Sequence, residues 1–230
     1  MIATSVMMCK RHRMEERSRT SNHPVIAQRL EQIYALFEAR APAVIEGCPC
    51  CVDRRNVDPL LTRPSRDLTG DDLRRYVSSV FLTLGAERDF RYLLPRILEL
   101  AILDPGALPD VEIILGNLSR ANWKSWAKAE REAIEGLVDV WFECAFQRDL
   151  ENAEDWLADC EAEHIMCGAA RAGLDITRYC EVFGRPEAEA LRAFLADRYA
   201  RALARNALPS CSFWEDAPEG WSVLAKQLSV

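Results

Sequence analysis

The sequence lacks the long apolar runs and the strand patterns that mark two large classes of protein. No apolar run approaches the roughly 18 residues of a membrane-spanning helix. No segment alternates apolar and polar residues over more than a few positions, and no Asn-Gly or Asp-Gly hairpin turn occurs. These absences argue against a helical membrane protein and against a mainly β fold.

Enzyme motifs are also missing. The chain has no Gly-x-Ser-x-Gly elbow, no His-Glu-x-x-His helix and no glycine-rich phosphate loop. It has three histidines, and His12 and His23 lie in or beside the N-terminal tail, so a histidine-dependent site would have to use His164. The sequence therefore favours a protein that is not an enzyme, and leaves the question open.

Helix periodicity is what the sequence has in abundance. Apolar residues recur three and four positions apart, as on the buried face of a helix. The stretch Asp104-Pro105-Gly106 is a strong stop signal. We predict helices over residues 22–41, 69–85, 87–103, 110–118, 123–147, 152–172, 175–183, 186–203 and 218–228.

Local signals place several helix ends. Asn22 is a candidate N-cap, and Thr69 with Asp72 has the form of a capping box. Gly85 is placed to close the second helix in a left-handed conformation. Pro95 predicts a kink or a split in the third helix. Residues 47–66 read as a loop that carries Cys-Pro-Cys-Cys.

These elements predict an all-α fold. Consecutive helices joined by short loops favour antiparallel helical pairs, as a helical bundle or a short, HEAT-like α-solenoid. We expect one helical domain over residues 22–230 and a flexible tail over residues 1–21, with Met14 as an alternative start.

The charge is unevenly distributed along an acidic chain with a net charge of −7. Residues 129–163 hold twelve acidic and two basic side chains, a net of −10, whereas residues 1–20 have a net of +3. The acidic balance argues against nucleic acid or a membrane surface as partner. An acidic helix face suits a protein partner with a basic surface. Candidate partner-binding residues on it are Glu130, Glu135, Asp139 and Glu143.

Cysteine usage indicates a reducing compartment. The nine cysteines are an odd number and too few for a disulfide scaffold. The N-terminus places its apolar part before its charges, the reverse of a secretory leader. We therefore expect a cytoplasmic protein whose cysteines are mostly small buried hydrophobes.

The Cys-Pro-Cys-Cys loop offers a metal or thiol site. Cys48 and Cys51 form a Cys-x-x-Cys pair, and zinc needs further ligands. The best supplement is a set of three residues at spacing i, i+4 and i+7 on one predicted helix face: Cys160, His164 and Cys167. The alternative is that Cys160 and Cys167 only pack in the core. We expect no cofactor unless zinc binds here.

A redox role for the pair has a weaker basis. A thioredoxin-like site needs a strand before the cysteines, and none is evident. The helical alkylhydroperoxidase D pattern needs a histidine where Arg55 stands. Arg54 and Arg55 would still lower the pKa of a nearby thiol.

Other candidates surround the predicted kink. Asp89 is placed to cap or pair near its helix start, and Arg91 and Arg96 to pair with carboxylates, Arg96 with one on a neighbouring helix. Trp126 lies on the predicted core stripe, and Trp123 at its rim.

Residues 45–145 resemble a family of uncharacterised bacterial proteins. The matching features are Cys48 and Cys51, the segment Asp89–Ile97 of the form Asp-Phe-x-x-x-Leu-Pro-Arg-Ile, and the pair Trp123 and Trp126. The resemblance implies a bacterial cytoplasmic helical protein and implies no activity.

We therefore predict a cytoplasmic bacterial interaction protein. One concrete form is an immunity- or antitoxin-like binder that sets an acidic helical surface against a basic partner. The alternative is a zinc-binding or thiol-dependent protein centred on Cys48 and Cys51.

Overall fold

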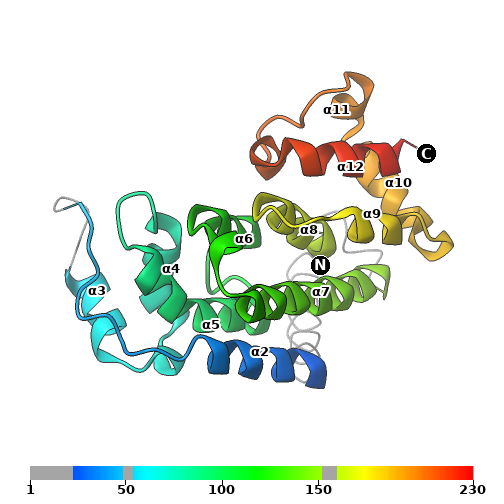
Figure 1. Ribbon diagram of the computed structural model, residues 1–230. Helices are drawn as coiled ribbons and strands as arrows, with labels where there is room; N and C mark the ends of the chain where they lie inside the picture. Colours follow the sequence, from blue (N-terminus) through cyan, green and yellow to red (C-terminus); the bar gives the residue numbers. More distant parts are fainter. Residues whose placement is uncertain (1–22, 49–53, 152–159, 230) are drawn as a thin grey trace, which may run out of the picture. The chain divides into compact units, whose positions relative to one another are not determined.

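The computed structural model describes residues 23–48, 54–151 and 160–229 (Figure 1). Within these ranges the regular elements are α-helices and short 3₁₀ helices, with two isolated β-bridges and no strand. The predicted all-α class is confirmed, as a helical bundle or solenoid. The antiparallel pairing and the HEAT-like repeat stay predictions.

The chain divides into two compact units. Unit 1 comprises residues up to Pro109 together with Trp126–Leu137, and unit 2 comprises Asp110–Ser125 and the chain from Val138 onward. Helix α7 (Lys128–Glu151) therefore contributes its first turns to unit 1 and the remainder to unit 2. The single domain expected over residues 22–230 stays a prediction, and the tail over 1–21 lies outside the described residues.

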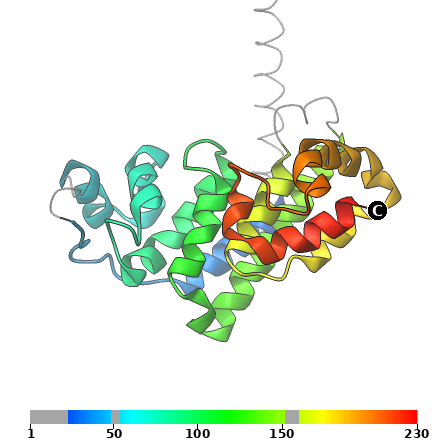
Figure 2. The same ribbon diagram turned by 90° about the horizontal axis from the view of Figure 1, so that it is seen from above.

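Unit 1 contains the N-terminal helices. They are α2 (Pro24–Leu36), α3 (Arg54–Thr62), the 3₁₀ helix η1 (Ser65–Asp67), α4 (Gly70–Ser79) and α5 (Glu87–Leu103). Helix α5 packs against α2, α4 and η1, and α3 lies beside α4 (Figure 2). The predicted apolar stripe of α2 is buried, and it consists of Ile26, Leu30, Ile33, Tyr34 and Phe37.

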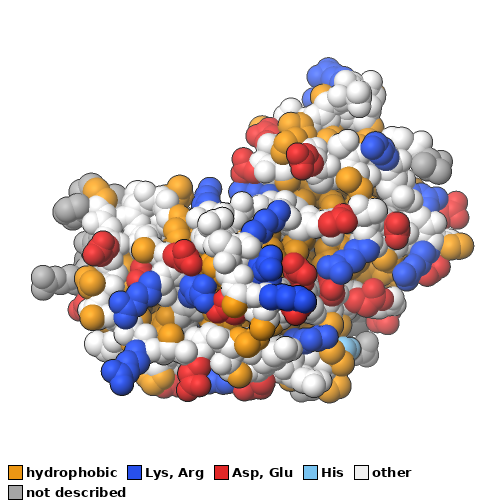
Figure 3. Space-filling model, viewed as in Figure 1, with side chains coloured by type: hydrophobic (Ala, Val, Ile, Leu, Met, Phe, Trp, Pro, Cys, Tyr) orange, Lys and Arg blue, Asp and Glu red, His pale blue; other side chains and the backbone are white. Residues whose placement is uncertain are grey.

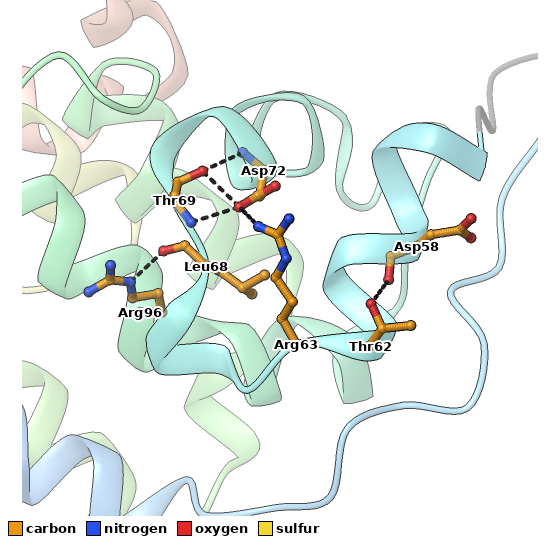
Figure 4. A network of polar contacts seen from close by, with 7 residues as sticks. All are labelled: Asp58, Thr62, Arg63, Leu68, Thr69, Asp72 and Arg96. Carbon is orange, nitrogen blue, oxygen red and sulfur yellow. Dashed lines mark hydrogen bonds and ion pairs between the residues drawn. The ribbon is translucent and has the colours of Figure 1, made fainter.

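The predicted capping box at the start of α4 is confirmed. The Thr69 hydroxyl accepts from the Asp72 amide at 3.3 Å, and the Asp72 carboxylate accepts from the Thr69 amide at 2.9 Å (Figure 4). Two backbone donors at the helix start are thereby satisfied. Asn22, the predicted cap of α2, lies outside the described residues, and His23 occupies the N-cap position.

Helix α4 ends earlier than predicted. It stops at Ser79, and Phe81 adopts a left-handed φ of 64° in the turn that follows. Gly85 has a φ of 74° but belongs to this turn and not to a helix end. The sequence predicted a longer helix because Val80 and Leu84, which follow the end of α4, are also apolar and buried. They continue the helical spacing of apolar residues beyond the helix.

Helix α5 is continuous through Pro95, so the split is wrong, and the alternative of a kink stays a prediction. Asp89 caps its first turn by accepting from the Ala86 amide at 2.7 Å, as expected. Arg96 donates to the Leu68 carbonyl (Figure 4). It pairs with Glu99 of its own helix, so the predicted carboxylate partner on a neighbouring helix is wrong.

The loop predicted over residues 47–66 is also wrong in part, because it contains α3. Val57 and Leu60 are buried on that helix. Pro59 inside the helix and the many polar neighbours conceal the apolar spacing in the sequence.

Unit 2 is built around α8 (Glu161–Arg171), which packs against α6 (Val111–Arg120) and α12 (Pro218–Leu228). The remaining elements are η2 (Trp123–Ser125), α9 (Thr177–Phe183), η3 (Pro186–Ala188), α10 (Glu189–Arg198), α11 (Ala200–Ala204) and η4 (Phe213–Asp216). Two predicted helices are thus subdivided: residues 123–125 form η2 ahead of α7, and residues 186–203 form three shorter elements.

Candidate functional site

A pocket of about 520 Å³ lies in unit 1 where the ends of three helices meet. The C-terminal end of α2, the first two turns of α5 and the first turn of α7 form its walls. The lining residues are Leu36, Phe37, Glu38, Ala39, Glu87, Arg88, Arg91, Tyr92 and Glu130. Its volume falls in the range of about 300–1,000 Å³ typical of ligand sites.

Arg91 and Glu130 form the inner wall of this α2–α5–α7 pocket. Arg91 donates to the Glu130 carboxylate, which is buried and also accepts from the Ala127 amide at 3.0 Å. The guanidinium of Arg91 lies 4.6 Å from the centre of the Trp126 ring and 5.6 Å from that of Phe37. These contacts fix Arg91 in place, so its charge is largely neutralised within the wall.

Two carboxylates remain at the mouth. Glu38 is exposed and has no hydrogen-bond or ion-pair partner among the described residues. Glu87 is about half exposed, and its contact with Arg91 is long, at 3.6 Å. Both are therefore available to a ligand.

The net charge around the pocket is negative. Arg88 is the remaining cation of the lining, and it acts on Asp89, the buried cap of α5. Burial raises the pKa of Asp89, and the charge of Arg88 lowers it in part. Among the lining residues, the three carboxylates of Glu38, Glu87 and Glu130 outnumber the two guanidinium groups of Arg88 and Arg91 by one.

The end of α2 adds to this negative character. A helix C-terminus carries partial negative charge on its unpaired carbonyl groups, and a basic residue in the last turn normally offsets it. The last turn of α2 contains no basic side chain. Leu36 ends this helix, and both it and Phe37 line the pocket, so the α2–α5–α7 pocket suits a cation.

The four predicted partner-binding acids differ in their surroundings. Glu130 is buried in the pocket wall, so its expected place on a solvated helix face is wrong. Asp139 accepts from Tyr179 and pairs with Arg178 within unit 2. Glu135 is partly exposed, and Glu143 is exposed, with a 3.2 Å contact to Gln147.

Two further acids of this segment are buried inside unit 2. Asp149 is buried and caps α8 by accepting from the Ala162 amide at 2.8 Å. Glu163 is also buried, and one oxygen accepts from the Tyr199 hydroxyl at 2.8 Å and from the Trp214 indole at 2.6 Å. Part of the net of −10 over residues 129–163 is therefore buried and does not contribute to the surface. On the face seen in Figure 3, acidic and basic side chains are interspersed.

The predicted metal ligands are not assembled among the described residues. No group of three or more His, Cys, Asp or Glu side chains with metal-binding geometry occurs in these ranges. Cys48 is partly exposed and its amide donates to the Thr83 carbonyl, whereas Cys51 lies outside the described residues. The Cys48–Cys51 pair therefore stays a prediction.

Of the three helix residues in the predicted set, Cys160 and His164 have structural partners and Cys167 is buried. Cys160 is the N-cap of α8 rather than a member of its face, and its thiol contacts Asp149 at 3.4 Å. Burial raises the pKa of the Cys160 and Cys167 thiols, as do nearby carboxylates. His164 pairs through Nδ1 with the buried Glu112 at 2.5 Å. The two thiols are thus poor thiolate ligands, as the core-packing alternative implies.

Of the two predictions for the tryptophans, one agrees with the structure and one is wrong. Trp126 is buried beneath Arg91, as the core stripe predicts. Trp123 is also buried, with its indole donating to the Ala172 carbonyl at 2.8 Å, so its expected place at a rim is wrong.

The sequence reasoning missed most of the pocket. It singled out Arg91 and Glu130, but not Glu38, Glu87 or Tyr92. One signal was present, since Glu38 follows directly on the last apolar residue of the α2 stripe, Phe37. The meeting of three helix ends has no local signature.

Comparisons with known proteins do not assign the chain to a family. No protein-family model matches the chain, and no curated protein or solved structure matches it either. The resemblance to the uncharacterised bacterial family stays an expectation. Among the described residues, no helix is both long enough and apolar enough to cross a membrane.

Proposed function

We propose that this chain is an interaction protein that binds a basic segment of a partner protein through the α2–α5–α7 pocket. The observation that carries the proposal is the excess of carboxylate in the pocket lining, where the exposed Glu38 and Glu87 accompany aromatic and aliphatic side chains. Such a lining accommodates the carbon stem of a long basic side chain while the carboxylates meet its charge.

The proposal moves the expected acidic interface from α7 to the pocket. The basic partner is retained, but Asp139 and the buried acids of unit 2 have internal roles and are not part of the interface. The burial of Glu130 supports this change, because a buried carboxylate paired with Arg91 supports a pocket wall and does not steer a partner from solution.

A salt-dependent binding measurement tests the proposal. The probe is a fluorescent peptide that alternates arginine and lysine with glycine and serine, followed by anisotropy as NaCl rises from about 50 to about 300 mM. We expect the basic peptide to bind and to weaken with salt, and a peptide with glutamate at the basic positions not to bind.

Matched variants locate the binding. Glu38→Gln with Glu87→Gln removes two charges at the pocket, and we expect affinity to fall about five- to tenfold. Asp71→Asn with Glu132→Gln removes two exposed charges elsewhere in unit 1 and should leave affinity within about twofold. Equal losses in the two double variants would contradict the proposal.

A further inference from the structure

We infer that His164 and Glu112 form a proton-dependent clamp between α6 and α8, which holds the two helices together most tightly while the imidazole is protonated. The clamp lies within unit 2, so it is independent of the function proposed for the α2–α5–α7 pocket of unit 1. The inference rests on the burial of the carboxylate, on its hydrogen bonding and on the charges around it.

The Glu112 carboxylate is buried and has one direct partner among the described residues. Its side chain is 4% exposed, and its Oε1 lies 2.5 Å from Nδ1 of His164. The second oxygen, Oε2, is also buried and has no hydrogen-bond partner there. A buried carboxylate without a counter-charge costs much more free energy than one paired with a cation. The charge on the imidazole therefore matters to the α6–α8 contact.

The His164 imidazole can exchange its proton with water while it contacts Glu112. Its side chain is 29% exposed, so the ring is not sealed in the core. A free imidazole titrates near pH 6.5. The protonated ring forms an ion pair with the carboxylate, whereas the neutral ring forms only a hydrogen bond. The contribution of the pair is thus present at mildly acidic pH and is lost as pH rises.

The nearest described charges of unit 2 make other contacts. Arg171 of α8 donates to the backbone carbonyl of Glu112 and to the Asp216 carboxylate of η4, rather than to the Glu112 carboxylate. Asp149 caps the start of α8, and Glu163 accepts from two buried donors. His164 is therefore the described cation in direct contact with this carboxylate.

The other charged side chains on the elements packed against α8 lie at the surface. On α8 itself, Glu161 pairs with Arg148 of α7 at 2.7 Å. The exposed charged residues of α6, η4 and α12, apart from Asp216, are Arg120, Glu215, Glu219 and Lys226. Exposed charges are screened by water and salt, so they affect the buried carboxylate less than the imidazole does.

Cys167 offers a probe of the clamp, because it follows His164 by one turn of α8 and is 1% exposed. A short pulse of an alkylating reagent modifies this thiol when the helix opens, and mass spectrometry of its peptide measures the extent. The variant His164→Gln keeps an amide donor but cannot take up a proton. We expect Cys167 to react about threefold faster in this variant than in the wild type at pH 6, and equally fast at pH 8. Comparing the two proteins at one pH cancels the pH dependence of the thiol and of Asp149.

A second variant tests the other side of the pair. Glu112→Gln removes the buried charge and keeps a polar group beside the imidazole, so Cys167 should again react faster than in the wild type at pH 6 and no faster at pH 8. His23→Gln is the matched control, because His23 lies at the start of α2 in unit 1, and it should not change the reaction at either pH. A ratio of variant to wild type that is the same at pH 6 and pH 8 for both pair variants would overturn the clamp. That result would leave the proposed function of the pocket standing.

Discussion

Arg91 donates to Glu130 from a position 39 residues earlier in the chain, and this pair joins the first turns of α5 and α7. Glu130 is the more deeply buried of the two, and its second oxygen accepts from the Ala127 amide at the start of its own helix. One carboxylate therefore caps α7 and fixes the arginine that forms the pocket wall.

Loss of Arg91 should destabilise the protein. Arg91→Leu leaves the Glu130 carboxylate buried without its cation, and we expect the free energy of unfolding to fall by about 2 kcal/mol in urea denaturation. The control is Lys128→Ala, which breaks an exposed pair with Glu132 at 3.6 Å and should change stability by less than about 0.5 kcal/mol. An equal loss of stability in Arg91→Leu and Lys128→Ala would show that burial does not strengthen the pair of Arg91 with Glu130.

The capping box of α4 provides a second stability test. Thr69→Ala removes the hydroxyl that accepts from the Asp72 amide, and we expect a loss of about 1 kcal/mol. Thr62→Ala is the control, because the Thr62 hydroxyl only donates to a carbonyl within α3 (Figure 4). A Thr62 variant as unstable as the Thr69 variant would contradict the capping role.

Asp149 should make stability depend on pH between about 4 and 6. Burial raises its pKa from 3.8 to about 6, so the native state binds the proton more tightly than the unfolded chain does. The contribution of Asp149 to the free energy of unfolding therefore falls by about 3 kcal/mol as pH rises from about 3.8 to about 6. Below about 3.8 both states are protonated, and above about 6 the loss is complete.

Melting temperatures of Asp149→Asn and the wild type, measured across this range, check the sign. The melting temperature of the variant should fall less with rising pH than that of the wild type. The difference between the two curves should therefore grow in the variant's favour as pH rises. Asp175→Asn is the control with opposite sign, because hydrogen bonds from Thr177 lower the pKa of Asp175. Parallel curves for Asp149→Asn and the wild type would contradict the assignment.

Glu163 should stabilise unit 2 through its hydrogen bonds more than through its charge. Glu163→Gln keeps an oxygen that accepts from Tyr199 and Trp214, whereas Glu163→Leu leaves both donors buried and unpaired. We expect the leucine variant to be about 3 kcal/mol less stable than the glutamine variant. Urea denaturation followed by circular dichroism measures the difference, and equal stability of the two variants would refute the hydrogen-bonding role.

Features set by neighbouring residues could be predicted from the sequence. Thr69 and Asp72 are three residues apart, and their capping box formed as expected. The stop after Leu103 was equally local. Each depends on the conformation of a few consecutive residues, which the identities of those residues constrain directly.

Features that depend on distant residues could not be predicted. A carboxylate on the polar face of a predicted helix looks the same whether it meets water or a cation from another element. Glu130 is buried because of Arg91, and Glu163 because of Tyr199 and Trp214, which follow it by 36 and 51 residues. Counting acids along residues 129–163 therefore overestimated the surface charge, and the meeting of three helix ends at the pocket had no signal in any single helix.

The most direct measurement is a map of backbone amide chemical shifts during titration with the basic peptide. We expect the largest changes at residues 36–39 and 87–92 and in the first turn of α7, with a much weaker response in Glu38→Gln/Glu87→Gln. Changes centred instead on the exposed part of α7 near Glu143, with the pocket amides unmoved, would contradict binding at the α2–α5–α7 pocket.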